Sequence, residues 1–228
     1  MKKYLVIKNL RKQIRDNAIL QNINLQVKKG EIVGIVGLNG SGKTTLLKCI
    51  LGFVNYDGGI FIDGKNVLCN KLHNFGFIIE NPNLYLHSSG WDNIKFWSKF
   101  YKNVDLKYVK SLCDSFNLDL RKKVKKYSLG MKQKLAIILS LINKPELLLL
   151  DEPTNGLDMK NIFLLRNVLL TLKDTTILIS SHDINELCKI CNRLIFINKG
   201  KIVKVLDKSS FLVYSESELI NFLESNYA

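Results

Sequence analysis

The stretch 37–44 constrains the fold of this chain more than any other part of its sequence. It reads GLNGSGKT and fits the pattern G-x-x-x-x-G-K-[ST], whose backbone surrounds nucleotide phosphates. The apolar run 32–36 directly before it predicts a buried strand, and a helix is expected directly after it, over about 44–51. A strand, a glycine-rich turn and a helix in this order predict an α/β fold that binds a nucleoside triphosphate.

Each residue type in this loop has a physical role toward a triphosphate. Glycines let backbone N–H groups approach phosphate oxygens without a Cβ clash, and the helix points its positive end at the same anion. Lys43 is expected to contact the β- and γ-phosphates, Thr44 to ligate Mg²⁺, and Thr45 to donate to the α-phosphate. The expected nucleotide-binding residues are Gly37, Leu38, Asn39, Gly40, Ser41, Gly42, Lys43, Thr44 and Thr45.

Two carboxylates follow the apolar run 147–150. Asp151 ends a predicted buried parallel strand, and ligands of open α/β sheets bind at the carboxyl ends of such strands. We therefore expect Asp151 to hold Mg²⁺ opposite Thr44. Glu152 lies one residue further on and is expected to orient a water molecule and accept its proton during attack on the γ-phosphate. The alternative is that one of these carboxylates only caps a helix.

The rest of the sequence alternates strands with helices. Strands are expected at 4–9, 23–27, 60–62, 74–80, 147–150, 176–180, 193–198 and 201–206. Helices are expected at 131–141, at 161–172, at 184–191 and after 216, and the apolar spacing between 81 and 143 is helical. Alternation of this kind predicts a mostly parallel sheet with right-handed crossovers. The stretch 81–143 is interpreted as a helical subdomain inserted into the sheet domain.

The chain is strongly basic, with 34 lysines and arginines against 20 acidic residues and a net charge of +14. Such a charge could attract nucleic acid, anionic lipid or an acidic partner. Because nearly all of the basic residues are lysine, no nucleic acid is expected as a partner. The densest basic run, 121–126, is interpreted either as a solvated face or as a contact with a membrane surface.

The lengths of the apolar stretches and the cysteine content indicate the cellular compartment of the protein. The longest mainly apolar stretch, 135–142, has eight residues, against about 18 needed to span a bilayer. The apolar run after Lys2 and Lys3 is too short for a secretory signal, so a cytoplasmic protein is expected. The five cysteines are expected to stay reduced. Cys188 and Cys191 form an isolated C-x-x-C pair and are interpreted as small apolar residues of a helix.

With these residues in hand, the chain resembles the ATPase subunit of ABC transporters, from about residue 4 to 206. YSLGMKQ at 127–133 is similar to the family signature, and NGLD at 155–158 is similar to its D-loop. Ser180, Ser181 and His182 resemble the strand end that carries the switch histidine. The resemblance implies a mostly parallel core sheet, an N-terminal antiparallel β subdomain and the helical insertion at about 81–143. This ATPase domain would span 1–206, with a helical extension over 207–228.

The resemblance also implies roles and partners. Ser128 and Gly130 would cap the γ-phosphate bound by a second copy, Asp158 would line that junction, and His182 would contact the γ-phosphate. Lys43, Glu152 and His182 would be the catalytic residues. The implied ligands are ATP and Mg²⁺. The implied partners are a second ATPase subunit, in a homodimer or a heterodimer, and a membrane permease encoded separately. The protein would therefore lie on the inner face of the cell membrane.

Four positions depart from the usual family pattern. Leu129 stands where the signature usually has glycine, and Met131 stands where it usually has glutamine. Glu80 replaces the usual Q-loop glutamine, where its oxygens could bind water or Mg²⁺. Ile14 lies where many members stack an aromatic ring on adenine. YSLGMKQ combined with Glu80 resembles the subgroup that exports, or confers immunity to, antimicrobial peptides of the bacitracin and lantibiotic kinds.

Other interpretations were weighed against a transporter motor. One alternative is a soluble ABC-type ATPase acting on nucleic acid or another assembly, but the DNA-repair members carry long coiled-coil insertions. Only about eighty residues separate Thr45 from Ser128 here. A GTPase would need a D-x-x-G motif, which the sequence lacks. Tyr85 and Trp91 could dock a permease helix or belong to the core of the helical subdomain.

Overall fold

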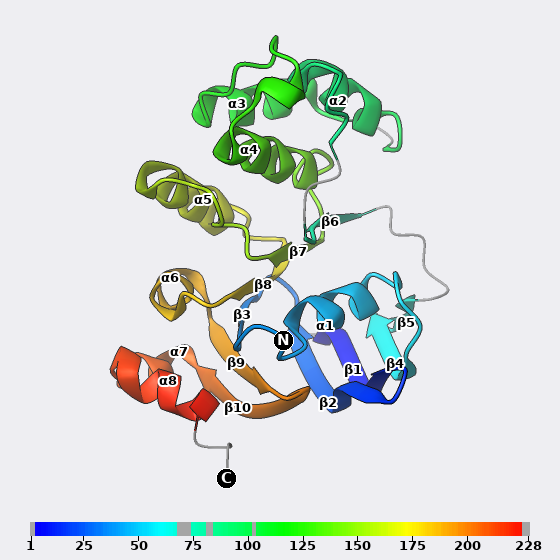
Figure 1. Cartoon of the computed structure of the whole chain (residues 1–228), viewed down its shortest axis with the longest axis vertical. Coiled ribbons are helices and arrows are strands. Elements are labelled where there is room, and N and C mark those ends of the chain that lie inside the picture. The colour runs from blue at the N-terminus through cyan, green and yellow to red at the C-terminus, as the bar shows by residue number, and fades with distance from the viewer. Residues whose placement is uncertain (1–2, 68–73, 81–83, 102–103, 225–228) are drawn as a thin grey trace. The chain divides into compact units, whose positions relative to one another are not determined.

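The computed structural model describes residues 3–67, 74–80, 84–101 and 104–224. The chain forms two compact units, of which the first comprises Met1–Leu72 and Thr176–Ala228, and the second His73–Thr175 (Figure 1). Each unit contains helices and strands. The predicted α/β class, with antiparallel and parallel sheets and helical segments, is confirmed.

The first unit begins with an antiparallel sheet of order β2-β1-β4-β5. Its strands are β1 (Lys3–Ile14), β2 (Asn17–Lys28), β4 (Asp57–Ile62) and β5 (Lys65–Asn66). β1 and β2 are longer than the sequence pattern predicts. The pairing register shifts between Ile7 and Leu10, and Asn9 has a φ of 49°. After a bulge of this kind the side chains switch to the opposite faces of the sheet, so the alternation of apolar and polar residues along β1 is interrupted.

The parallel part of the first unit has the strand order β10-β9-β3-β8. β3 (Ile32–Val36) pairs in parallel with β8 (Thr176–Ser181) and with β9 (Arg193–Asn198), and β10 (Lys201–Asp207) returns antiparallel to β9. Every residue of β3 and of β8 is buried. Strands that lie inside a parallel sheet with both faces covered have this uniform burial.

The helices of the first unit are α1, α6, α7 and α8. They span Lys43–Ile50, Ile184–Ile190, Lys208–Phe211 and Glu216–Glu224. α8 packs on β9, where the side-chain amide of Asn198 donates to the backbone oxygen of Leu223 at 2.8 Å. The Phe222 ring also meets the rings of Phe196 and Tyr214 edge to face. The segment after β10 is therefore held to the sheet rather than extending from it.

The second unit pairs β6 (Phe75–Ile78) in parallel with β7 (Leu147–Asp151). Its helices are α2 (Gly90–Ser98), α3 (Leu106–Ser115), α4 (Leu129–Ser140) and α5 (Met159–Thr171), with the short 3₁₀ turn η2 at Val124–Lys126. Of these, α4 packs on β6. The four leucines of β7 are at most 1% exposed. Each contributes about 2 kcal/mol of hydrophobic stabilisation.

The described cysteines have no disulfide partner. Cys49, Cys113 and Cys191 are buried, and burial raises the pKa of the Cys49 and Cys113 thiols to about 11. Burial also raises the pKa of Cys191. Thiols that stay protonated at neutral pH are poor nucleophiles and metal ligands, which supports a packing role. Cys69 lies outside the described residues.

No helix in the described part of the chain has the length and apolarity to cross a bilayer.

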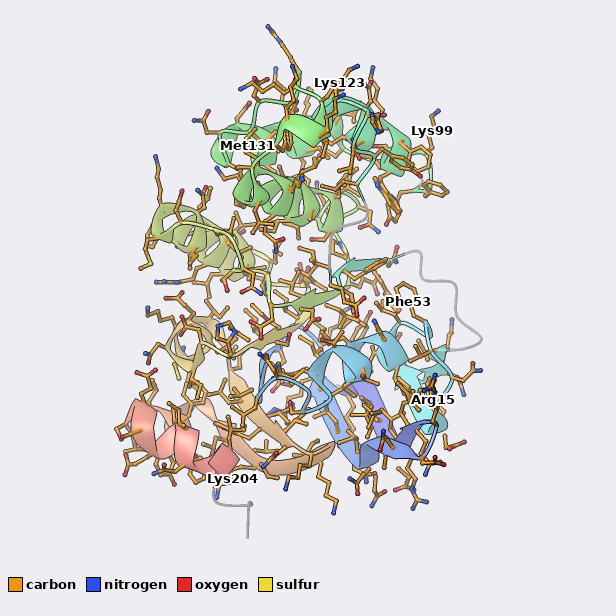
Figure 2. All side chains as sticks on the ribbon, viewed as in Figure 1. Arg15, Phe53, Lys99, Lys123, Met131 and Lys204 are labelled. Atoms are coloured by element: carbon orange, nitrogen blue, oxygen red, sulfur yellow. The ribbon has the colours of Figure 1, made fainter. Side chains whose placement is uncertain are left out.

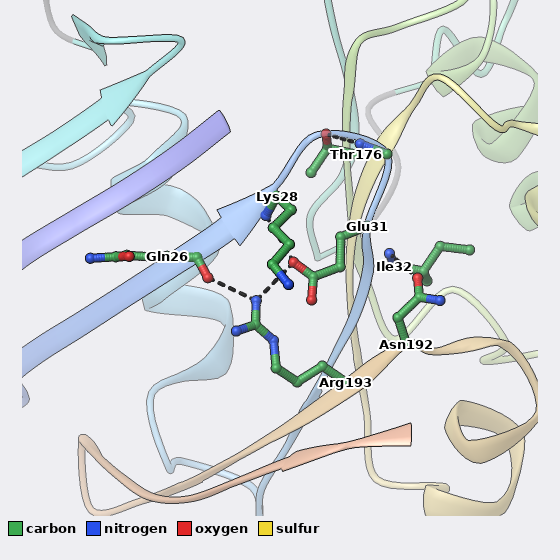
Figure 3. A network of polar contacts seen from close by, with 8 residues as sticks. Gln26, Lys28, Glu31, Ile32, Thr176, Asn192 and Arg193 are labelled. Atoms are coloured by element: carbon green, nitrogen blue, oxygen red, sulfur yellow. Dashed lines mark hydrogen bonds and ion pairs between the residues drawn. The ribbon is translucent and has the colours of Figure 1, made fainter. Parts of the chain in front are cut away.

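A partly buried ion pair fixes the start of β3 (Figure 3). Glu31 and Arg193 pair at 2.8 Å, with side chains only 11% and 17% exposed. The same carboxylate accepts the Lys28 backbone N–H at 2.8 Å, and Arg193 also donates to the backbone oxygen of Gln26 at 2.7 Å. The pair thus joins the end of β2 to β9.

We expect Glu31→Ala to lower the free energy of unfolding by about 1–3 kcal/mol, because it removes the charged partner of a partly buried guanidinium and the acceptor of the Lys28 N–H. Lys189→Ala is the matched control, since it removes a lysine that is 48% exposed from an i,i+3 pair with Glu186. That loss should stay below about 0.5 kcal/mol. Urea unfolding measures both, and equal losses would contradict the role assigned to Glu31.

Candidate nucleotide site

The predicted phosphate loop leaves β3 and runs into α1. Gly42 caps α1 with a φ of 109°, a backbone conformation that other residues rarely adopt, and no side chain caps this helix. The N–H groups at such a helix start favour an anion, so the start of α1 is suited to bind a phosphate group. Leu38, Asn39 and Gly40 are exposed, whereas Ser41 and Lys43 are buried.

The loop fits a phosphate group. The hydroxyl of Ser41 is buried and has no hydrogen-bond partner. The Lys43 ammonium donates to the backbone oxygens of Gly37 and Leu38 at 2.7 and 3.3 Å, so it is held within the loop. A Cβ at Gly37 would stand 2.4 Å from Ser41 Oγ and 2.5 Å from Ile197 O. An unsatisfied hydroxyl, a confined ammonium and a loop closed to side chains are the features that a bound anion requires.

The turn between β9 and β10 supports the phosphate loop. Gly200 donates its N–H to the backbone oxygen of Ser41 at 3.0 Å and accepts from the N–H of Gln21 at 2.8 Å. A Cβ at Gly42 would lie 2.9 Å from Leu20 Cδ2, so β2 packs against the loop as well. The sequence predicts only a turn at Lys199 and Gly200. Nothing in the local pattern indicates that this turn contacts residues so distant along the chain.

The predicted switch histidine lies beside the phosphate loop in the sheet order. β8 neighbours β3 in parallel, and Val36 is in register with Ser181. The segments that follow, 37–44 and His182, therefore leave the sheet at the same edge. Ser180 and Ser181 are buried, His182 is exposed, and Ser181 Oγ accepts the N–H of Asp183 at 3.0 Å. The first unit thus brings the phosphate loop and the histidine together.

The second unit brings the carboxylates to one edge in the same way. Ile78 of β6 is in register with Leu150 of β7, so Glu80 and the pair Asp151 and Glu152 follow neighbouring strand ends. Asp151 is 8% exposed, and Glu152 is partly exposed. Asp158 and Asp183 cap α5 and α6, whereas neither Asp151 nor Glu152 is the residue that caps a helix.

Glu80 and Glu152 have unusual backbone conformations. Their φ values are 57° and 46°, and they are the two glutamates among the described non-glycine residues with positive φ. A residue with a Cβ in this region is strained by about 1–3 kcal/mol, so the surroundings must enforce the conformation. Because such strain clusters at functional sites, it supports a site role for both carboxylates. The sequence pattern carried no signal of it.

The signature-like segment begins α4. Ser128 caps this helix by accepting the N–H of Met131 at 3.2 Å. The helix starts at Leu129, two residues earlier than the start at Met131 that the sequence predicts. Gln133 is buried and donates to the backbone oxygen of Pro153 at 2.9 Å. This bond connects α4 to the loop directly after Glu152, and it is a positioning contact that the sequence did not reveal.

The D-loop-like segment packs against the signature-like one. A Cβ at Gly130 would stand 2.8 Å from Gly156 O, and one at Gly156 would stand 2.7 Å from the Leu129 Cγ. Asp158 caps α5 by accepting from the N–H and the side-chain amide of Asn161 at 2.9 and 2.7 Å. These hydrogen bonds, above all the one from the backbone N–H of Asn161, lower the pKa of Asp158. The second unit therefore joins Ser128, Gly130 and Asp158 in one cluster.

The next question is which residues could hold Mg²⁺ and which could contact the adenine ring. In the described residues no group of three or more His, Cys, Asp and Glu side chains could hold a metal ion. Mg²⁺ in nucleotide sites takes only one or two carboxylates, with phosphates and waters completing its shell, so the residues present fit that ion. Ile14 ends β1 and is 51% exposed, which leaves an apolar surface at the position predicted for adenine.

We expect Gly37→Ala to weaken ATP binding by about tenfold or more, because the new methyl group would overlap Ser41 Oγ and force the loop open. The control is Gly64→Ala, at a turn with a φ of 79° and no atom within 4 Å of the new Cβ. It should cost about 1 kcal/mol of stability but leave ATP affinity unchanged. Fluorescent-nucleotide titration measures both, and equal affinities for the two variants would refute the phosphate-binding assignment.

Sequence comparison identifies the relatives of the chain. A family model described as "ABC transporter" matches residues 20–155. The lantibiotic transport ATP-binding protein SrtF of Streptococcus pyogenes is 39% identical over 228 residues, covering 97% of this chain and 96% of SrtF. The bacitracin transport ATP-binding protein BcrA of Enterococcus faecalis is 36% identical over 213 residues, covering 88% of this chain and 68% of BcrA.

Solved structures agree with this result. An ATP-binding subunit of an ABC transporter matches with a TM-score of 0.88 at 26% identity, covering 97% of this chain and 99% of that one. The bacterial ABC transporter cassette MJ0796, a dimer, matches with a TM-score of 0.79 at 25% identity, covering 90% and 98%. MJ0796 is also known as a dimer with ADP and phosphate bound. The chain therefore belongs to the ABC transporter family, as one of its ATP-binding ATPase subunits.

Proposed function

We propose that this chain is the motor subunit of a transporter that moves antimicrobial peptides out of the cell or away from their target. The observation that carries the motor role is the placement of functional groups at the carboxyl ends of neighbouring parallel strands in both units. The peptide class is supported by SrtF and BcrA, whose names assign them to lantibiotic and bacitracin transport.

The phosphate loop would bind ATP through residues 37–45. Lys43 is confined to the loop by two carbonyl oxygens, and it would transfer its hydrogen bonds to the β- and γ-phosphates. Thr44, Asp151 and Glu80 would hold Mg²⁺, since hydroxyl and carboxylate oxygens are the ligands it prefers. The ion, when bound, neutralises charge that develops on the phosphate oxygens.

Glu152 would orient the attacking water and accept its proton, and His182 would hydrogen-bond the γ-phosphate from the neighbouring strand end. The positive φ of Glu152 determines the direction in which its side chain leaves the backbone, and Gln133 supports the next residue, Pro153, through its backbone oxygen. A fixed base avoids the cost of reorganisation during proton transfer.

A second ATPase subunit would complete the site. Ser128 and Gly130 lie at the start of α4, where helix N–H groups favour an anion, and Asp158 lies at the start of α5. Leu129 and Met159, next to these residues, are 64% and 76% exposed, so the cluster has an apolar surface for a partner to cover. The dimeric MJ0796 cassette supports this assembly.

A permease encoded separately would couple this motor to the peptide. The complex would lie on the inner face of the cell membrane. An ATPase domain at 1–206, with the helical insertion at about 81–143 and the extension at 207–228, is the domain organisation that we propose. Tyr85, which is 47% exposed and contacts the Phe96 ring, and Trp91, which is partly exposed, remain candidates for the permease contact. The alternative of an ATPase acting on nucleic acid is not favoured, because the named relatives serve transport.

We expect Glu152→Gln to reduce ATP hydrolysis by about a hundredfold or more while ATP binding is retained, because the amide cannot accept the proton of the water. Glu146→Gln makes the same chemical change before the start of β7, at an exposed position. The control should hydrolyse ATP at the normal rate. Phosphate release and nucleotide titration measure the two properties, and normal turnover by Glu152→Gln would defeat the assignment.

Dimer formation can be tested in the Glu152→Gln background, where bound ATP persists. We expect ATP to convert the protein to a dimer and Leu129→Arg to prevent this without loss of ATP binding, because a charge would be buried in the contact. Leu170→Arg, at a position 48% exposed on α5, should still dimerise. Sedimentation velocity distinguishes the species. A dimer that tolerates Leu129→Arg would exclude the proposed contact.

A further inference from the structure

The excess positive charge of this chain is concentrated in its helical part. Residues 84–143 contain twelve lysines and arginines but four acidic residues, so this stretch holds +8 of the net charge of +14. Five of the twelve lie within six consecutive positions, and all five are exposed. We call them the basic turn: Arg121, Lys122, Lys123, Lys125 and Lys126. Lys123 is labelled in Figure 2 on the outer side of this part of the chain.

The basic turn has a fixed backbone. Val124 in its middle is fully buried. The segment 120–125 runs antiparallel to 86–91, with a bridge between Ser89 and Lys123. Four backbone hydrogen bonds connect the two segments: Lys125 N to Leu86 O at 2.7 Å, Val124 N to Ser88 O at 2.9 Å, Trp91 N to Leu120 O at 3.0 Å and Gly90 N to Lys122 O at 3.2 Å. A ligand would thus meet a set of charges on an ordered backbone, which lowers the entropic cost of binding.

The charges of the basic turn are largely unmatched. In the described part of the chain its one ion pair joins Lys122 to Asp119 at 3.6 Å, with side chains 57% and 46% exposed. Exposed pairs of this kind contribute little free energy. The other four cations are exposed and form no ion pair among the residues that the structure describes, although the Arg121 backbone N–H donates to Asp119 at 3.1 Å. The turn therefore presents a positive potential to an anionic surface.

Apolar and aromatic side chains lie beside these cations. Tyr85 and Leu86 are 47% and 45% exposed, and the hydrogen bond from Lys125 to Leu86 places this pair next to the turn. Trp91, on the same antiparallel segment, is partly exposed. Tyrosine and tryptophan favour the interface between lipid and water, and lysines beside them favour anionic headgroups. The surface thus combines apolar area that can enter the lipid interface with positive charge that attracts anionic headgroups.

We infer that the basic turn, with Tyr85 and Leu86, binds the anionic lipid surface of a membrane directly. This contact goes beyond the proposed motor function and does not need the permease. Six residues span at most about 20 Å, which favours a local patch of headgroups over a path along nucleic acid phosphates. Lysine, which forms four of the five cations, acts as a point charge and lacks the planar fork that reads bases.

The test uses the purified chain without any permease and measures co-sedimentation with lipid vesicles. Phosphatidylcholine vesicles with about 30% phosphatidylglycerol should bind the protein, whereas pure phosphatidylcholine vesicles should not. Binding should be lost between about 0.05 and 0.5 M salt, since salt screens the headgroup charge. Equal binding to both kinds of vesicle would overturn the inference.

Two matched quadruple variants separate the basic turn from overall charge. Both replace exposed basic residues by glutamine and lower the net charge by four. The turn variant is Arg121→Gln, Lys122→Gln, Lys123→Gln and Lys125→Gln, and the control is Lys29→Gln, Lys65→Gln, Lys173→Gln and Lys201→Gln. The turn variant should bind anionic vesicles about tenfold or more weakly, and the control less than about twofold. Equal losses in the two variants would overturn the inference.

Two further measurements exclude misfolding of the variants and nucleic acid binding as explanations. Unfolding midpoints close to that of the parent chain must accompany the binding data, so that a loss is not one of folding. A duplex oligonucleotide that binds the chain more tightly than anionic vesicles, and loses this in the turn variant, would replace the lipid by nucleic acid and refute the inference. Failure of the motor role is seen separately, as normal hydrolysis by Glu152→Gln.

Discussion

Parallel pairing of buried strands is the constraint on which the rest of this structure depends. Val36 in register with Ser181, and Ile78 with Leu150, determine that the loops that follow leave the sheet at shared edges. Nearly all side chains of these strands are buried, so slipping one residue would expose apolar surface and is strongly disfavoured. The chemistry is therefore positioned by hydrophobic burial, and the loops need little stability of their own.

Polar contacts then adjust what the strands have positioned. In the first unit, Gly200 accepts from β2 and donates to the phosphate loop, so two distant segments hold Ser41 in place. In the second unit, Gln133 donates to Pro153 and thereby connects the signature-like helix to the loop of the carboxylates. These bonds are buried or close to buried groups, where an unmade hydrogen bond costs about 1–3 kcal/mol. These hydrogen bonds therefore favour one conformation of each loop over other conformations.

Glu80, Leu129 and the basic turn differ in how firmly the structure holds them. Glu80 stands where the family resemblance predicts an amide, and its φ of 57° is a strained backbone conformation that the surroundings must enforce. Leu129 replaces a glycine, and it fits because Gly156 lacks a side chain at the point of contact. The five exposed cations lie at the opposite extreme: they make few contacts within the chain, and such a surface is explained by a partner more readily than by folding.

The sequence alone determined the α/β class, the glycine-rich loop between a strand and a helix, and the position of the carboxylates after β7, because these depend on periodicity and on turn chemistry within a few residues. The predicted length of β1 was too short, because a bulge at Asn9 interrupts the alternation of side chains. The predicted start of α4 was too late, because Ser128 caps the helix and the helix begins directly after it. Only the tertiary structure decided that Gly200 supports the loop, that Gln133 bonds to Pro153, and that Glu80 and Glu152 take left-handed backbones. Such features join residues far apart in the chain, and only the packing of the whole unit brings them into contact.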